Sequence, residues 1–193
     1  MTPKTETDAA LVSRSRADPA HFNGLFNRHA VAVHRFLSRR GGTQLADDVL
    51  GEVFTQAFAA RDRYDTDRES ALPWLYGIAH NLLRTELRSK ERERSVTARW
   101  AARVGTDAPL EDLVARLDAE RQPVLAAVAT LSADEREVLL LVAWEDLTPS
   151  QAAAVLGIPA GTARSRLHRA RALLRDALNS GATDTTYRKE MHA

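Results

Sequence analysis

The segment 148–175 restricts the fold of this chain more than any other. Thr148, Pro149 and Gln151 form a typical helix start, in which threonine caps the first turn and proline occupies a position that needs no N–H. Gly157 suits the turn that ends this short helix, because a residue just past a helix end often adopts a left-handed backbone. A second, longer helix then follows. The pattern predicts a helix-turn-helix unit.

The second helix of this unit has an apolar side and a basic side. The apolar side, expected to pack on the protein, consists of Ala163, Leu167, Ala170, Leu173 and Leu174. Residues 157–178 contain five arginines and one acid, so the local charge is +4. The candidate DNA contacts on and beside the basic side are Arg164, Ser165, Arg166, His168, Arg169, Arg171 and Arg175. Such a helix fits the major groove, with early residues on base edges and later arginines on phosphates; the alternative is a solvated amphipathic helix.

Charge alternates in sign along the chain, although the net charge is only +1. Residues 43–67 carry six acids and two bases, whereas residues 84–103 carry seven bases and three acids. Residues 104–147 carry ten acids and three bases. Two basic segments separated by an acidic one predict two contacts with nucleic acid on one chain.

Composition favours a cytoplasmic protein. The chain of 193 residues has no cysteine, which excludes a disulfide framework and a thiolate metal site and is compatible with a reducing compartment. Residues 1–13 lack the apolar core of a signal peptide. The longest apolar run, residues 138–144, is too short to span a bilayer, so no membrane insertion is expected.

Apolar periodicity at helical spacing predicts an all-α fold with two small helical domains, and no β-alternation is present. The expected order is a tail with a short helix (1–18), a first domain (19–94), a linker (95–118), a second domain (119–179) and a loose tail (180–193). Residues 1–8 are expected to be frayed, and a short helix is expected at Leu110–Leu117. Three or four helices with such regular stripes can bury a core in each domain.

The first domain is expected to contain three helices. The first starts at Asp18, which is followed by proline, and ends at Gly41 and Gly42. Its apolar stripe comprises Phe22, Leu25, Phe26, Val33, Phe36 and Leu37. Thr43 is expected to cap the second helix and Ser70 the third, with a polar loop over Arg61–Glu69 between them. The third helix is expected to pack Trp74 on its apolar side, with base stacking as the alternative, and to carry on its opposite side His80, Asn81, Arg84 and Arg88.

Motifs of known catalytic chemistry are missing. No two histidines are spaced i, i+4, no Glu-x-x-His occurs, and neither a phosphate-binding glycine loop nor a nucleophile elbow is present. Asp47, Asp48 and Glu52 are more typical of solvated or partner-facing carboxylates than of acid–base groups. The sequence therefore predicts a protein that is not an enzyme and takes no cofactor, with a helical metalloenzyme as the weakest alternative.

Three blocks of sequence, 45–58, 74–88 and 131–175, resemble a bacterial RNA polymerase sigma factor of the extracytoplasmic-function group. The resemblance extends over about 19–94 and 119–178, and the blocks follow the order of that family. It implies a subunit without catalytic activity that directs core RNA polymerase to promoters and helps to open the DNA. The alternative is a helix-turn-helix regulator that binds DNA without entering polymerase.

The resemblance also implies roles for individual faces. The second helix of the first domain is implied to bind the β′ clamp through Asp47, Asp48, Val49, Leu50, Glu52 and Phe54. Gly51 stands where the family usually has glutamine. The third helix and the loop before it are implied to capture a flipped base of the −10 element, with Asn81 as the polar reader and His80, Arg84 and Arg88 beside it. The helix-turn-helix is implied to recognise the −35 element.

The partners implied by the resemblance are core RNA polymerase, through its β′ clamp and β flap, and promoter DNA. The acidic linker is implied to thread the polymerase near the RNA exit path. Many members of the group are held by an anti-sigma protein that grips both domains, which adds an anti-sigma factor to the candidate partners.

Overall fold

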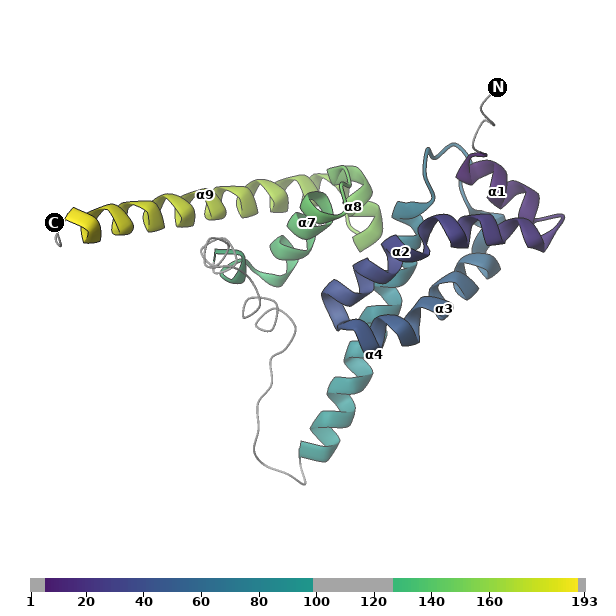
Figure 1. Cartoon of the computed structure of the whole chain (residues 1–193), viewed down its shortest axis with the longest axis horizontal. Helices are drawn as coiled ribbons and strands as arrows, with labels where there is room; N and C mark the ends of the chain where they lie inside the picture. The colour runs from purple at the N-terminus through teal and green to yellow at the C-terminus, as the bar shows by residue number, and fades with distance from the viewer. Residues whose placement is uncertain (1–5, 99–126, 191–193) are drawn as a thin grey trace. The chain divides into compact units, whose positions relative to one another are not determined.

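The computed structural model describes residues 6–98 and 127–190, with side chains for residues 6–90 and 127–177. These residues form helices joined by turns and contain no strand, which confirms the all-α expectation (Figure 1). The chain divides into two compact units, Met1–Gly105 and Thr106–Ala193. Most of the expected linker and the helix expected at Leu110–Leu117 lie outside the described residues, so the exact domain limits stay a prediction.

The helices of the first unit surround one apolar core. In chain order they are α1 (Asp8–Ser15), the 3₁₀ turn η1 (Pro19–His21), α2 (Phe22–Gly41), α3 (Thr43–Ala60), the 3₁₀ turn η2 (Arg61–Arg63) and α4 (Leu72–Ala98). α2 packs against α1, α3 and α4, and α3 also packs against α4 (Figure 1). The fully buried side chains at the centre of the core include Leu25, Val33, Phe36, Leu37, Val53 and Leu75.

The helix boundaries in this unit lie at or beside the expected turn residues; α4, for example, begins at Leu72, whose amide donates to the Ser70 hydroxyl at 3.2 Å. Asp18 caps η1 by accepting a hydrogen bond from the Ala20 amide at 3.0 Å. Gly42 separates α2 from α3 with φ 82° and ψ 163°. The expectation that Thr43 caps α3 is wrong, because Gly42 is the cap residue and Thr43 is the first residue of the helix. A left-handed φ at this junction demands glycine.

The N-terminal helix α1 begins inside the segment that was expected to be frayed. Thr7 caps it by accepting a hydrogen bond from the Ala10 amide at 3.2 Å. Leu11 and Val12 are buried, and Asp8 is only 4% exposed. The expectation of a frayed tail is therefore wrong at Asp8, whose partners lie far along the chain.

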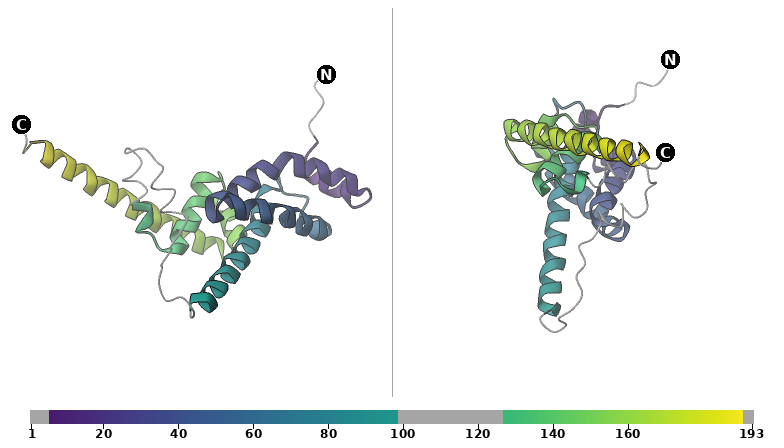
Figure 2. Two further views of the ribbon diagram at one scale, coloured as in Figure 1. Left: turned by 60° about the horizontal axis from the view of Figure 1, so that its bottom comes forward. Right: turned by 90° about the vertical axis from the view of Figure 1, so that its left-hand side faces the viewer.

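The second unit confirms the helix-turn-helix prediction. Its helices are α7 (Ala133–Trp144), α8 (Pro149–Leu156) and α9 (Ala160–Glu190). Both expected capping boxes are present, Ser132 with Glu135 and Thr148 with Gln151. Gly157 ends α8 in the left-handed region at φ 65°. α9 continues as one helix to Glu190, through most of the segment that was expected to form a loose tail (Figure 2).

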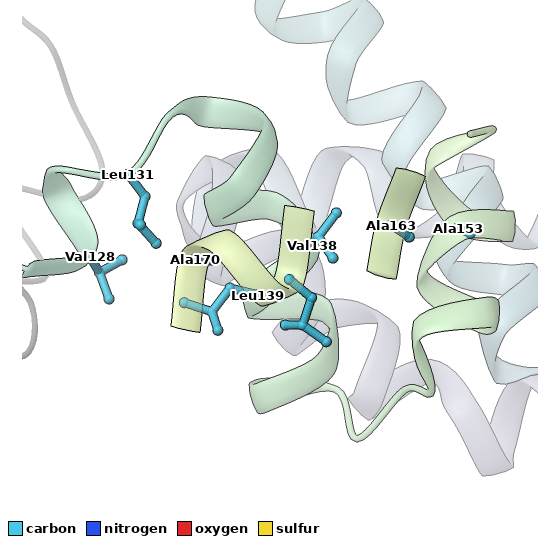
Figure 3. Packing of buried hydrophobic residues seen from close by; sticks show 8 residues of the cluster. Val128, Leu131, Val138, Leu139, Ala153, Ala163 and Ala170 are labelled. Atoms are coloured by element: carbon cyan, nitrogen blue, oxygen red, sulfur yellow. The ribbon is translucent and has the colours of Figure 1, made fainter. Parts of the chain in front are cut away.

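The core of the second unit is built from aliphatic residues and alanines. The buried members are Val128, Leu131, Val138, Leu139, Ala153, Ala163, Leu167 and Ala170 (Figure 3). The alanines leave room for the larger side chains of α7, so the helices pack closely. The expectation that Leu173 joins this core is wrong, because Leu173 is 45% exposed. Leu174 follows Leu167 by one heptad and stays on the buried stripe, whereas Leu173 is rotated by about 100°.

Within the part of the chain that the structure describes, no helix combines the length and the apolarity needed to cross a membrane.

Candidate nucleic-acid and protein interfaces

The outer side of α9 presents most of the predicted DNA-contacting residues. The residues with exposed side chains are Arg164, Ser165, His168, Arg169, Arg171 and Arg175. Arg166, which was placed at the border, is half-buried. The Thr148 capping box and the left-handed Gly157 set the start of α8 and the turn into α9. These local features fix the position at which α9 begins, and the basic side of α9 remains exposed to solvent.

Two of these arginines are already paired within the protein. Arg166 forms an ion pair with Asp134, and Arg169 Nε donates to Glu135 Oε1 at 3.0 Å. Glu135 is also the acidic member of the capping box, and the Ser132 hydroxyl donates to it at 2.6 Å. The hydrogen bond from Ser132 and the contact with Arg169 hold the pKa of Glu135 below its ordinary value.

The arginines of α9 therefore form two groups. Arg166 and Arg169 are bound to the acidic first turn of α7, so a phosphate must compete with a carboxylate for them. Arg164, Arg171 and Arg175 are exposed on the same helix. The sequence alone did not separate the groups, because the acids lie more than thirty residues before their partners.

The polar side of α4 is formed by three of the four predicted residues. Asn81, Arg84 and Arg88 are exposed and follow one another at helical spacing. The expectation that His80 shares this exposed side is wrong, because the residue is only 8% exposed. His80 follows the buried Tyr76 by one turn, and it therefore faces the core.

The residues predicted to bind a protein partner on α3 also divide. Asp47, Asp48 and Glu52 are exposed, and Leu50 is half-buried. Val49 is 5% exposed and Phe54 is 6% exposed, so these two pack inside the first unit. The exposed carboxylates have neighbours on the protein itself: His34 Nε2 lies 2.8 Å from Asp47 Oδ1, and Gln56 Nε2 donates to Glu52 Oε1 at 3.0 Å.

An apolar groove lies between α2 and α3, beside these carboxylates. It has a volume of about 340 Å³, and its lining residues are Pro19, Phe22, Asn23, Phe26, Gly51, Phe54, Thr55 and Phe58. A Cβ atom added at Gly51 would meet no other atom within 4 Å. Phe26 was expected in the core but is 40% exposed at this groove, with its ring 4.8 Å from that of Phe54. The missing side chain at Gly51 contributes to the open groove.

The loop of residues 64–71 between η2 and α4, hereafter the α3–α4 loop, is connected to α1 at both of its ends. At its start, Arg16 Nη2 donates to the carbonyl oxygens of Arg61, Asp62 and Tyr64 at 3.2, 3.3 and 3.4 Å. At its end, the Ala71 amide donates to Asp8 Oδ2 at 2.8 Å.

The Asp8 carboxylate is the centre of a buried polar cluster. His29 Nε2 lies 2.7 Å from Oδ2, Arg28 bonds Oδ1, and the Ser70 hydroxyl donates to Oδ2 at 3.4 Å. Burial acts to raise the pKa of Asp8, but the hydrogen bonds from His29 and the Ala71 amide outweigh it. The pKa of Asp8 is therefore held well below its usual range.

Sequence reasoning missed Asp8 and Arg16. The available signal was Thr7 as a cap with Asp8 in the first turn, which marks a helix start but names no distant partner. In the ranges 6–98 and 127–190, no group of three histidine or carboxylate side chains is arranged to hold a metal ion.

Two family models match the chain. Residues 25–93 match Sigma-70 region 2, and residues 121–174 match Sigma-70, region 4. The chain is similar to RNA polymerase sigma factor CarQ of Myxococcus xanthus, with 36% identity over 160 residues, 81% of this chain and 88% of the relative. It is 38% identical over 152 residues to ECF RNA polymerase sigma factor SigC of Mycobacterium tuberculosis, which covers 75% of this chain and 77% of the relative.

Solved structures show the same fold. The structure of CnrH in complex with the cytosolic domain of CnrY matches with a TM-score of 0.63 and 26% identity, over 91% of this chain and 99% of that one. The sigma factor RpoE of Bartonella quintana, solved with the anti-sigma factor NepR, matches with a TM-score of 0.55 and 24% identity, over 82% and 96% of the two chains. The chain belongs to the sigma-70 family of RNA polymerase sigma factors, in its ECF group.

Proposed function

We propose that this chain is a sigma subunit that binds core RNA polymerase, directs it to specific promoters and promotes DNA opening. The observation that carries the proposal is the presence of exposed polar and basic faces on α4 and α9, in segments that match Sigma-70 regions 2 and 4. We place its action in the cytoplasm, because bacterial transcription takes place there. Its curated relatives are named as sigma factors, and we assign it no catalytic step.

The first domain, residues 19–94, is proposed to recognise the −10 element. Asn81 supplies an amide that can both donate to and accept from the edge of a flipped base. Arg84 and Arg88 lie one and two turns further along the same side of α4, where their charges suit the phosphates of a single strand. Burial of His80 supports a packing role for it beneath this face.

The second domain, residues 119–179, is proposed to recognise the −35 element through α9. Arg164, Ser165 and His168 lie near the start of the helix, which is the part of a recognition helix that reaches base edges. Arg171 and Arg175 are suited to phosphate contacts further along. Arg166 and Arg169 are proposed to set the angle between α9 and α7 through their ion pairs, and to contact DNA only when phosphate displaces the carboxylates.

The outer side of α3 is proposed to bind the β′ clamp of polymerase. Asp47, Asp48 and Glu52 supply the exposed negative charge, and Leu50 supplies apolar contact at the edge. Val49 and Phe54 support this surface from inside the domain. The β flap is the proposed partner of the second domain. An anti-sigma protein is a further proposed partner, since the Bartonella quintana sigma factor of the same fold was solved with one.

Run-off transcription with purified core polymerase tests the proposal. A genomic DNA library serves as the template for core polymerase, with and without this chain. Sequencing of the transcripts then maps the promoters that are used. We expect transcripts that start at specific sites and that require both the chain and core polymerase. A chain that binds duplex promoter DNA alone and does not associate with core would instead be a regulator acting outside polymerase.

A matched pair of variants tests the residue roles on the mapped promoter. Asn81→Ala is expected to reduce open-complex formation, measured by permanganate reactivity of unpaired thymines, while −35 binding is retained. Ser89→Ala changes another exposed polar side chain of α4 and serves as the control. If Asn81→Ala opens a linear promoter template as well as the wild type does, Asn81 has no role in base capture.

A further inference from the structure

Helix α1 contacts the segment that leads into the α3–α4 loop through its C-terminal end. The Arg16 guanidinium donates from one nitrogen to three nearby carbonyl oxygens, those of Arg61, Asp62 and Tyr64. In the opposite direction, Arg61 Nε donates to the Ser15 carbonyl at 3.3 Å. Figure 1 shows α1 close to this segment, and the contacts between α1 and η2 agree with the view. These bonds fix the backbone where the loop begins.

The N-terminal end of α1 holds the other end of the same loop. Asp8 accepts from the Ala71 amide and from the Ser70 hydroxyl, and it is 4% exposed. Because the acceptor is an ionised carboxylate, its bond to the amide is stronger than a bond to a neutral acceptor. His29 and Arg28 hold the carboxylate in place from α2.

Between these two ends the α3–α4 loop is open to solvent. The side chains of residues 65–69 are all exposed. The hydrogen bonds within this part are local, from the Asp67 amide to Asp65 Oδ1 at 3.1 Å and from Arg68 Nε to Asp65 Oδ2 at 3.4 Å. The Tyr64 ring, at the start of the loop, packs 4.9 Å from the ring of Trp74 on α4. A loop with fixed ends and an exposed middle is suited to take up a ligand without first being ordered.

We propose that α1 pre-orders the α3–α4 loop for capture of an unstacked base of single-stranded promoter DNA, with Asp8 and Arg16 as positioning residues. The proposal rests on the proposed function, since it concerns the loop that precedes the helix carrying Asn81. Neither residue touches the DNA. If the ends of the loop are released, ordering it costs conformational entropy at the moment of base capture, and discrimination among bases falls.

The test uses the full chain with core polymerase on a mapped promoter whose −10 and −35 positions are randomised. Asp8→Asn and Arg16→Ala are compared with Arg14→Ala, an exposed arginine of the same helix that pairs with Glu6. We expect base preference at the −10 positions to fall by about tenfold in both test variants, as a loss of a few ordered contacts would produce. Preference at the −35 positions is expected to be unchanged, and Arg14→Ala is expected to match the wild type.

The −35 preference separates positioning from stability. A variant that is merely less stable would make less transcript from every template and keep both preferences, and that result would overturn the proposal. If Asp8→Asn does not fold, Arg16→Ala still decides, because Arg16 lies on the surface. Hydrogen exchange of the Ala71 amide in the full chain provides a second readout, and unchanged protection in Asp8→Asn would also count against the proposal. Absence of core-dependent transcripts with the wild-type chain would instead refute the proposed function itself.

Discussion

Replacing two glycines of α3, one at its N-cap and one in its interior, tests how backbone geometry stabilises the first unit. Gly51 lies in the interior of α3, and a Cβ atom added there meets nothing within 4 Å. Gly42 precedes the same helix with φ 82° and ψ 163°. Gly51→Ala is expected to raise the free energy of unfolding by about 1 kcal/mol, because alanine restricts the unfolded chain and favours the helix.

The same chemical change at Gly42 is expected to have the opposite sign. The backbone conformation of Gly42 belongs to a region that is nearly restricted to glycine, so Gly42→Ala should cost roughly 1–3 kcal/mol. In a domain of this size, 1 kcal/mol corresponds to a change of roughly 4–8 °C in Tm. The two variants should therefore move the Tm of the first unit in opposite directions.

Thermal unfolding of the full chain, followed by circular dichroism and by tryptophan fluorescence, measures both shifts. Gly24→Ala provides an intermediate case, because its Cβ would lie 2.7 Å from Leu11 Cδ2, the flexible end of a side chain. The rise in Tm for Gly24→Ala should be smaller than the rise for Gly51→Ala. A lower Tm for Gly51→Ala, or a shift of the same sign at Gly42 and Gly51, would refute the reasoning.

Further predictions concern four single residues. Arg164→Ala should weaken −35 binding by roughly 1–3 kcal/mol and relax base preference. Arg175→Ala should weaken binding to all DNA sequences alike and reduce the slope of log K against log salt concentration by about 1. Fluorescence anisotropy over a salt series measures both effects. Thr148→Ala removes the capping box of α8 and should lower the free energy of unfolding by about 1 kcal/mol in urea; an unchanged midpoint would contradict the cap's role. Folding lowers the pKa of Asp8 from its ordinary 3.8, because its hydrogen bonds outweigh the effect of burial. The ionised carboxylate therefore stabilises the fold above pH 3.8, and this contribution is lost progressively as the pH falls below that value. The difference in unfolding free energy between wild type and Asp8→Asn should therefore shrink as the pH falls from about 5 to 2, and a constant difference would show that the charge plays no part.

The sequence by itself determined the features that depend on neighbours three or four residues apart. The capping boxes at Ser132 and Thr148 and the left-handed turn at Gly157 are present where the pattern predicted them. Each of these features joins groups within one turn of chain, so no knowledge of the fold was needed. The apolar stripes that predicted the all-α fold are local in the same way.

Only the tertiary structure decided which polar side chains are exposed and which are paired. His80 is buried although it adjoins the exposed Asn81, because the packing of α4 determines where its buried side ends. Arg169 meets a carboxylate 34 residues away, and Asp8 meets an amide 63 residues away. Partners at such separations are brought together by the packing of whole helices, which a local pattern does not contain. The polar sides of α4 and α9 were predictable as helix sides, whereas the connection of α1 to the α3–α4 loop was not.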